Sequence, residues 1–302
     1  MPSGAEALFV PAAERLTLAL GGALGAIVLV ERHHLRELTR RVLFVRWRTW
    51  LVTAPIYGAA VMWSRWGALA FAMLLAGVAS WEYARLAGLP RAYRTALIGV
   101  GAASLLGASL AAEAWTAVQP VALLALTLIP LIRQDVRDGF RNLAYTVAGY
   151  LYLPMLLGFF LLLRERVAGG PGLLLAIGTA VAASDVAAFI AGKAFGHRAL
   201  ADRVSPAKTL EGVAGNLIGA YAGFALMSFA VPETVGPVAR AILPAAIAIG
   251  CVWGDLLESL IKRCADRKDA AGWLPGFGGL LDRIDSLLIA MPLAYTVVRW
   301  TS

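Results

Sequence analysis

Long apolar runs separated by short polar intervals make up most of this chain of 302 residues. A helix that crosses the hydrocarbon core of a bilayer needs roughly 20 predominantly apolar residues. The candidate runs cover residues 16–30, 49–63, 66–86, 95–112, 117–132, 143–163, 172–192, 213–231, 239–260 and 280–298. The runs at 49–63 and 117–132 are short, and Pro55 and Pro130 inside them favour kinks or re-entrant segments. The pattern predicts an all-α, polytopic integral membrane protein with about ten transmembrane helices.

The composition agrees with this class. Of all residues, 60% are hydrophobic and 15% are charged, as is typical of polytopic membrane proteins. The polar intervals are too short for a soluble domain. No basic stretch precedes the first apolar run, so we expect that run to stay as an anchor and not to be removed as a signal peptide. Cys251 and Cys264 lack the spacing of a metal site or a disulfide framework.

Basic residues gather in alternate polar intervals. Most of them lie in 31–50, 90–94, 133–141, 193–211 and 262–277, whereas Arg65, Arg164 and Arg166 lie in intervals of the other set. Because the cytoplasmic loops of membrane proteins are rich in Lys and Arg, these intervals are predicted to face the cytoplasm. The arginines of 31–50 either only fix this topology or belong to an interfacial helix that attracts anionic lipids.

Charged side chains are concentrated between residues 254 and 286, near the C-terminal end. Asp255, Ser259 and Lys262 are spaced i, i+4 and i+7 and therefore share one helix face. Asp282 and Asp285 are spaced i and i+3 and share a face of the next helix. Two helix ends that present carboxylates to each other form a hard-oxygen site, which suits Mg²⁺ when it also holds substrate phosphates.

A glycine-rich turn at 275–279 leads into the second of these helices. Its backbone N–H groups are predicted to approach phosphate oxygens closely, and the positive end of the helix behind it favours anions. Lys262, Arg263, Arg267 and Lys268 would hold the remaining phosphate charge. The alternative is a basic cytoplasmic loop with a glycine turn between two membrane helices.

A second set of polar residues begins at Asp185, inside an apolar run where an unpaired charge is costly. A basic, glycine-punctuated turn follows at 192–198, and then Ser-Pro-Ala-Lys-Thr-Leu-Glu-Gly at 205–212. Ser or Thr followed by Glu is also typical of a helix start, so this segment either only opens the next helix or contributes to a site.

Three glycines, Gly215, Gly219 and Gly223, follow at strict four-residue steps. Glycines on one helix face let a neighbouring backbone approach closely. They predict tight helix packing, either within the core of the chain or at the contact of a homodimer.

The segment around 254–286 resembles the signature of the phosphatidate cytidylyltransferases, also called CDP-diacylglycerol synthases. The matching positions are Ser259, Lys262, Arg263, Lys268, Asp269, Pro275, Gly276, Gly278, Gly279, Asp282, Arg283 and Asp285. The segment 205–212 is similar to a second element of that family, and Asp185 with Gly192, Phe195 and Gly196 resembles the part just upstream. Phe277 departs from the pattern, because the family usually has histidine there. The resemblance covers about 143–302 and predicts a catalytic transmembrane region there, preceded at 1–142 by transmembrane helices with the basic cytoplasmic loop 31–50.

The resemblance implies a membrane nucleotidyltransferase that forms CDP-diacylglycerol and pyrophosphate from CTP and phosphatidate. It implies Mg²⁺ held by Asp255 and Asp282 with Asp285 in support, and a second cation is left open. The implied catalytic residues are Lys208, Lys262, Arg263, Asp269 and Arg283. The implied substrate-binding residues are Asp185, Ser205, Thr209, Glu211, Lys268, Gly278 and Gly279. The expected partners are CTP, phosphatidate or another anionic lipid phosphate, and membrane lipids, but no nucleic acid. The expected location is the cell inner membrane, with several spans and the active site facing the cytoplasm.

Two alternatives remain at this stage. Phe277 in place of histidine is compatible with a transferase that acts on a different lipid phosphate. Outside enzymes, a transporter or a non-catalytic homologue would account for Asp185 and the glycine-rich helix. The chain has no evident inverted repeat, and its phosphate-type residues lie on one predicted side, which favours the enzyme.

Overall fold

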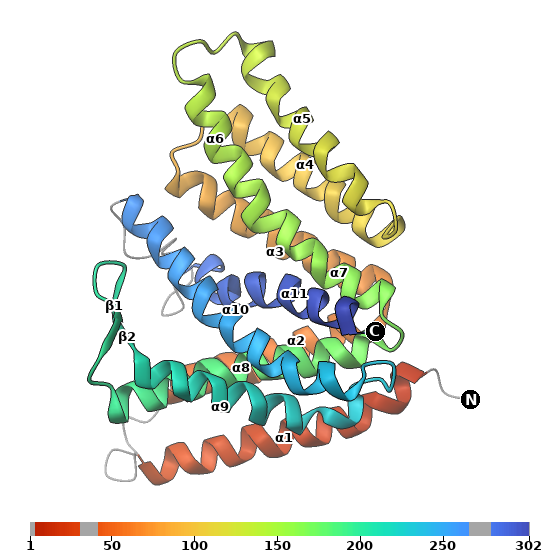
Figure 1. Cartoon of the computed structure of the whole chain (residues 1–302), viewed down its shortest axis with the longest axis vertical. Coiled ribbons are helices and arrows are strands. Elements are labelled where there is room, and N and C mark those ends of the chain that lie inside the picture. The colour runs from red at the N-terminus through yellow and green to blue at the C-terminus, as the bar shows by residue number, and fades with distance from the viewer. Residues whose placement is uncertain (1–3, 31–41, 266–278, 302) are drawn as a thin grey trace.

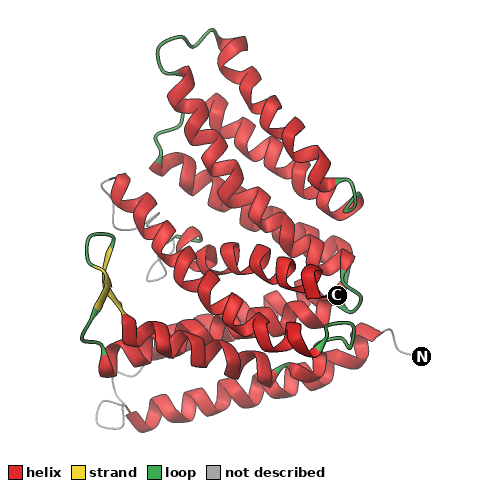
Figure 2. Cartoon of the chain, in the orientation of Figure 1, coloured by secondary structure: helices red, strands yellow, loops and turns green. Residues whose placement is uncertain are grey.

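The structure, a computed structural model, describes residues 4–30, 42–265 and 279–301. About 84% of the described residues are helical. In the described part the strands are limited to one short hairpin, which Figure 2 shows in yellow. The all-α prediction is therefore confirmed.

The helices follow the predicted apolar runs. They are α1 (Gly4–Val30), α2 (Val42–Trp63), α3 (Arg65–Leu86), α4 (Arg91–Leu110), α5 (Trp115–Arg133), α6 (Gly139–Tyr150), α7 (Leu156–Arg166), α8 (Gly170–Phe195), α9 (Leu210–Leu226), α10 (Pro237–Cys264) and α11 (Leu281–Thr301). A π-helical turn, Leu151–Met155, joins α6 to α7, and a 3-10 turn, Ser228–Ala230, follows α9. The hairpin consists of β1 (Ala199–Ala201) and β2 (Ser205–Thr209). Each of the ten predicted runs lies almost entirely within these helices and turns.

Seven of the described helices are long and apolar enough to cross a membrane. They are α1, α3, α4, α5, the continuous α6–α7 segment, α8 and α10. Helix α9 has only 17 residues, and α2 and α11 are not among the seven. Several spans are thus supported, whereas the number ten stays a prediction.

The structure describes only the second half of the interval 31–50. Residues 42–50 form the first turns of α2 and continue into the apolar run, so both alternatives for the arginines of this interval stay predictions. Trp47 Nε1 donates to the carbonyl of Leu20 at 2.9 Å and so ties α2 to α1. Pro55 lies inside α2, which remains one helix around it. Residues 31–41 lie outside the described part.

The helices form two groups with α10 and α11 between them (Figure 1). Helices α3 to α7 lie in the upper part of that view, and α1, α8 and α9 lie in the lower part. One continuous hydrophobic core includes buried residues of both groups, among them Leu97, Leu161 and Leu174, together with Leu288 of α11. The helices with most of the predicted site residues therefore lie inside the bundle.

The glycine face of α9 packs against α8 of the same chain. A Cβ atom on Gly219 would lie 2.7 Å from Ala187 Cβ and 2.8 Å from Ser184 Cα, which is closer than real side chains approach. Gly223 is similarly crowded by Thr179 and Ala180. The alternative of packing within the chain is thereby confirmed for these glycines. The close approach places the part of α8 that carries Asp185 against the middle of α9.

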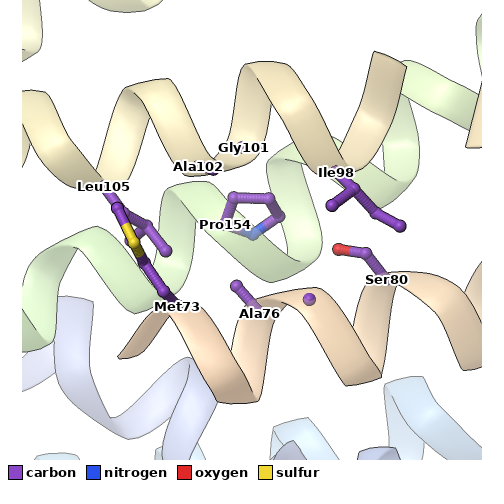
Figure 3. A pocket seen from close by; sticks show the side chains of 9 residues that line it. Met73, Ala76, Ser80, Ile98, Gly101, Ala102, Leu105 and Pro154 are labelled. Carbon is purple, nitrogen blue, oxygen red and sulfur yellow. The ribbon is translucent and has the colours of Figure 1, made fainter. Parts of the chain in front are cut away.

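A small cavity lies between α3, α4 and the π-helical turn (Figure 3). It measures about 20 Å³, which is room for roughly one water molecule. Ser80, Gly101 and Pro154 are among its lining residues, and the Ser80 hydroxyl has no hydrogen-bond partner among the described residues. The cavity is too small for a nucleotide or a lipid chain and is lined by none of the predicted site residues.

Candidate active site

The predicted site residues of the two polar segments meet at the end of α10. Lys208, on strand β2, forms an ion pair with Asp255 on α10. Arg263, near the end of α10, directs its Nε toward the carbonyl of Val204 in the hairpin turn at 3.5 Å. The hairpin from the second polar segment is thus placed against the helix that opens the main charged segment.

Local hydrogen bonds fix the shape of this hairpin. Ala199 pairs with Thr209, and Ala201 pairs with Ser205, in an antiparallel register. Thr209 caps α9, because its hydroxyl accepts a hydrogen bond from Gly212 N at 3.1 Å. Residues 205–209 therefore form a strand, and the helix start recognised in the sequence comes at the end of that strand.

Glu211 closes the other side of the hairpin. Its carboxylate accepts hydrogen bonds from the backbone N–H groups of His197 at 3.2 Å and Arg198 at 3.4 Å. Its own backbone N–H, followed by those of His197 and Arg198, lowers the pKa of Glu211 below its ordinary value. Glu211 and Thr209 thus hold the segment that carries Lys208, which agrees with a role in shaping the site.

Lys262 links α10 to α11. Its ammonium lies 2.6 Å from Glu258 Oε1, one helical turn earlier, and 3.0 Å from Asp282 Oδ1 on α11. Glu258 is 2% exposed. Sequence reasoning gave Glu258 no role, although its i, i+4 spacing to Lys262 is the usual signal for such a pair.

Backbone N–H groups at the start of α11 donate to carboxylates in this structure. Gly279 N donates to Asp282 Oδ2 at 2.9 Å. Leu280 N and Leu281 N donate to the two oxygens of Glu82, at 3.0 and 2.8 Å. The sequence predicted that this turn binds phosphate; for the described amides, phosphate would have to replace these carboxylates.

Three aspartates from three helices approach one another next to the Lys208–Asp255 pair. Ser286 Oγ lies within hydrogen-bond distance of Asp185 Oδ1 at 3.3 Å and of Asp255 Oδ1 at 3.4 Å, and its one hydroxyl proton is shared between them, so it joins α8, α10 and α11. The carboxyl of Asp285 is in hydrogen-bonding contact with Asp255 and is 7% exposed. Gly254 permits this approach, because a Cβ there would collide with the backbone of Asp285. Sequence reasoning did not identify Ser286.

Tyr152 is a further residue that the sequence did not indicate. It lies in the π-helical turn and is 6% exposed, and its hydroxyl has no hydrogen-bond partner among the described residues. It lies close enough to Asp285, Glu258 and Asp255 to interact with them electrostatically. Single π-helical turns inside α-helices are frequent at functional sites.

The remaining predicted residues are placed as follows. Arg283 is exposed on the first turn of α11, and Ser205 begins β2. Lys268, Asp269 and Gly278 lie outside the described residues, as does Phe277. The structure therefore brings together Asp185, Lys208, Asp255, Lys262, Arg263, Asp282 and Asp285, with Ser205, Thr209 and Glu211 in the adjoining hairpin.

The donor set fits a hard cation that is shared with a substrate. Among the described residues, no group of three or more His, Cys, Asp or Glu side chains is arranged as a ready metal site. Mg²⁺ in phosphate-handling sites needs only one or two carboxylates, since waters and substrate oxygens complete its shell. The Asp255 and Asp282 side chains are 34% and 16% exposed, and each already faces a cationic ammonium. Asp285 is more deeply buried, behind Asp255.

Comparison with known proteins identifies the family. Residues 44–301 match the model of the cytidylyltransferase family. A phosphatidate cytidylyltransferase of Pseudomonas aeruginosa is 34% identical over 242 residues, which is 77% of this chain and 88% of that protein. The chain belongs to the cytidylyltransferase family. A phosphatidate cytidylyltransferase of Thermotoga maritima is 34% identical over 60% of this chain and 69% of that protein. Another, of Haemophilus influenzae, is 44% identical over 40% of this chain and 43% of that protein.

The family match is more extensive than the resemblance seen in the sequence. The match begins at residue 44, so it also covers α3, α4, α5 and nearly all of α2, beyond the residues 143–302 over which the sequence showed the resemblance. The contact of Glu82 with the start of α11 shows that an N-terminal helix within this match packs against the helix that carries Asp282 and Asp285. The division into regions 1–142 and 143–302 stays a prediction.

Proposed function

We propose that this protein is a phosphatidate cytidylyltransferase that forms CDP-diacylglycerol and pyrophosphate from CTP and phosphatidate. The observation that carries the proposal is the pair of lysine–carboxylate contacts, Lys208–Asp255 and Lys262–Asp282, which converge on α10 from the hairpin and from α11. The relatives named above are phosphatidate cytidylyltransferases, and this paired arrangement suits a substrate with several phosphates.

In the proposed reaction a phosphate oxygen of phosphatidate forms a new bond to the α-phosphorus of CTP. The bond between that phosphorus and the oxygen bridging to the β-phosphate breaks, and pyrophosphate leaves with the electron pair. A phosphate monoester is already a nucleophile at neutral pH, so no Ser, Cys or His nucleophile is required. Catalysis then depends on positioning the two phosphates and on neutralising their charge.

The chain supplies that charge from residues now held in ion pairs. On CTP binding, Lys208 and Lys262 would turn from Asp255 and Asp282 toward phosphate oxygens, and the freed carboxylates would hold Mg²⁺. Bound Mg²⁺ supplies positive charge that stabilises the phosphates as charge develops on the leaving group. Arg263 and Arg283 lie on the same two helices and would contact the triphosphate or the lipid phosphate. Lys268, Asp269, Gly278 and Gly279 remain proposed site residues on the connecting segment, and a second cation remains open.

The proposed setting is the cell inner membrane, with about ten spans and the site at the cytoplasmic end of α10. The seven helices of suitable length and composition support several spans. At that end of α10, CTP would enter from the water and phosphatidate from the surrounding lipids. A homodimer also stays a proposal.

The test is direct assay of the purified protein. In mixed micelles containing phosphatidate, Mg²⁺ and CTP labelled at the α-phosphate, label should enter the lipid fraction and equal amounts of pyrophosphate should form. The Asp255→Asn variant, purified in the same way, is the matched negative control. Absence of label in lipid with the wild-type protein, across a range of phosphatidate and Mg²⁺ concentrations, would refute the proposal.

A further inference from the structure

Glu82, near the end of α3, makes a long-range contact with the start of α11. Its side chain is fully buried, at 0% exposed. Its Oε1 accepts a hydrogen bond from Leu280 N at 3.0 Å, and its Oε2 accepts one from Leu281 N at 2.8 Å. These donors lie 198 and 199 residues later in the chain. A glutamate from the N-terminal helices thus caps the helix that carries Asp282 and Asp285.

The two partners satisfy each other. A buried carboxylate is costly unless it is hydrogen-bonded. The first N–H groups of a helix have no partner within the helix, and they form its positive end. Hydrogen bonds to a charged acceptor are roughly twice as strong as neutral ones. The contact therefore favours one particular starting point for α11, with Leu280 and Leu281 at the Glu82 carboxylate.

That starting point decides where the α11 carboxylates lie. Asp282 follows Leu281 directly and reaches Lys262 at 3.0 Å, and Asp285 lies one turn later beside Asp255. A slip of one residue would move each α11 side chain by about 1.5 Å along the helix and about 100° around it. Such a slip would take Asp282 away from Lys262 and turn Asp285 away from α10.

We propose that Glu82 is a positioning residue of the transferase: it anchors the first turn of α11 so that Asp282 and Asp285 face the phosphate-binding groups of α10. The expected effect of Glu82 on kcat rests on the proposed function. Its structural part concerns the amide groups of α11 and is measurable without substrate.

The experiment compares three variants with the wild-type protein. Glu82→Gln keeps the shape of the side chain but removes its charge and one acceptor oxygen, and Glu82→Ala removes the cap. Glu165→Gln is the matched control, because Glu165 on α7 is also a mostly buried glutamate and pairs instead with Arg65 at 3.2 Å and Arg164 at 2.9 Å. Hydrogen–deuterium exchange of the segment 279–285 reports on the cap, and kcat at saturating CTP reports on positioning.

We expect Glu82→Gln to speed exchange in 279–285 and to lower kcat at least about tenfold, since a displacement of about 1 Å at reacting groups costs on the order of a hundredfold. Glu82→Ala should show a larger effect on both, and Glu165→Gln should leave 279–285 and kcat unchanged. If Glu82→Ala does not fold, Glu82→Gln decides alone.

If the Glu82→Gln variant shows the same hydrogen–deuterium exchange in 279–285 and the same kcat as the wild-type protein, the inference is overturned. Faster exchange with wild-type kcat would overturn it as well, because Glu82 would then be a helix cap without influence on catalysis. An inactive wild-type protein would instead refute the proposed function, and the exchange data would still decide whether Glu82 anchors α11.

Discussion

The ammonium of Lys262 lies 3.0 Å from Asp282 Oδ1 and thereby joins α10 to the first turn of α11. The same ammonium lies 2.6 Å from Glu258, so one lysine pairs with two carboxylates. In the proposed function, a substrate phosphate competes with these two carboxylates for the lysine. The pair is therefore expected to act in catalysis as one unit.

This expectation is tested with Lys262→Met, Asp282→Asn and the double variant. Each single change should lower kcat/KM about a hundredfold or more, as removal of one charge-stabilising group does in other active sites. The double variant should be little worse than the poorer single variant, because groups that act together are not additive. Steady-state kinetics on all four proteins measures this, and a fully multiplicative loss would show that the two residues act independently.

The exposure of the carboxylates predicts different responses to Mg²⁺. Asp255→Asn should abolish turnover at ordinary Mg²⁺ concentrations, because its side chain, 34% exposed, is open to a shared cation. Asp285→Asn should act more mildly, raising the Mg²⁺ requirement about tenfold, since it lies behind Asp255 as a supporting group. Initial rates against Mg²⁺ concentration separate the two, with unchanged purification behaviour as the control. Near-normal turnover of the Asp255→Asn variant would show that Asp255 does not hold the cation.

The packing of α9 on α8 predicts a penalty for a single methyl group. Gly219→Ala would place a Cβ 2.7 Å from Ala187 Cβ, and we expect a loss of about 1–3 kcal/mol in the free energy of unfolding. A Cβ on Gly99 of α4 would meet no atom within 4 Å, so Gly99→Ala should be neutral or stabilising by up to about 1 kcal/mol. Thermal unfolding in detergent compares the two. Equal midpoints would contradict the close helix contact.

The two ends of α10 are predicted to lie on opposite sides of the membrane, because α10 is long and apolar enough to cross it. Cys264, exposed at one end, should react with an impermeant maleimide from the cytoplasm, as should a cysteine introduced at Ala207. A cysteine at Glu233 should react only from the other side, and the buried Cys251 should not react before denaturation. Single-cysteine variants in oriented vesicles provide the measurement. Labelling of positions 207 and 264 from opposite sides would exclude a common site.

Phe277, which lies outside the described residues, is the position where the chain departs from the family pattern. A histidine can donate a hydrogen bond to phosphate, whereas a phenyl ring cannot. On phosphatidate we expect Phe277→His to raise the rate several-fold, with an unchanged unfolding midpoint. An unchanged or lower rate would favour a different lipid phosphate as the acceptor, which assays with other acceptors would then identify.

The helices were predictable because each is an apolar run of nearly the right length, and in a membrane such a run has no other stable structure. For Lys208 and Asp255, the sequence predicted only that their two polar segments lie on the same side of the membrane. The distance between them depends on the hairpin, which the sequence did not indicate: Ser205–Thr209 contains a proline and reads as a helix start.

Glu82 shows why the rest could not be predicted. In the sequence it is one acidic residue within an apolar run, and nothing nearby indicates a partner 198 residues away. Ser286 and Tyr152 are similar cases, since their importance comes from three-dimensional neighbours on other helices. Local spacing identifies residues that share one helix face, whereas contacts between distant helices require the fold.

The cap on α11 also bears on how the protein is made. Glu82 leaves the ribosome well before Leu280 and Leu281 exist, so α3 enters the membrane with a carboxylate whose later amide donors are still missing. On the proposed function, the site is complete only once α11 has been inserted, because Asp282 and Asp285 lie on that last helix.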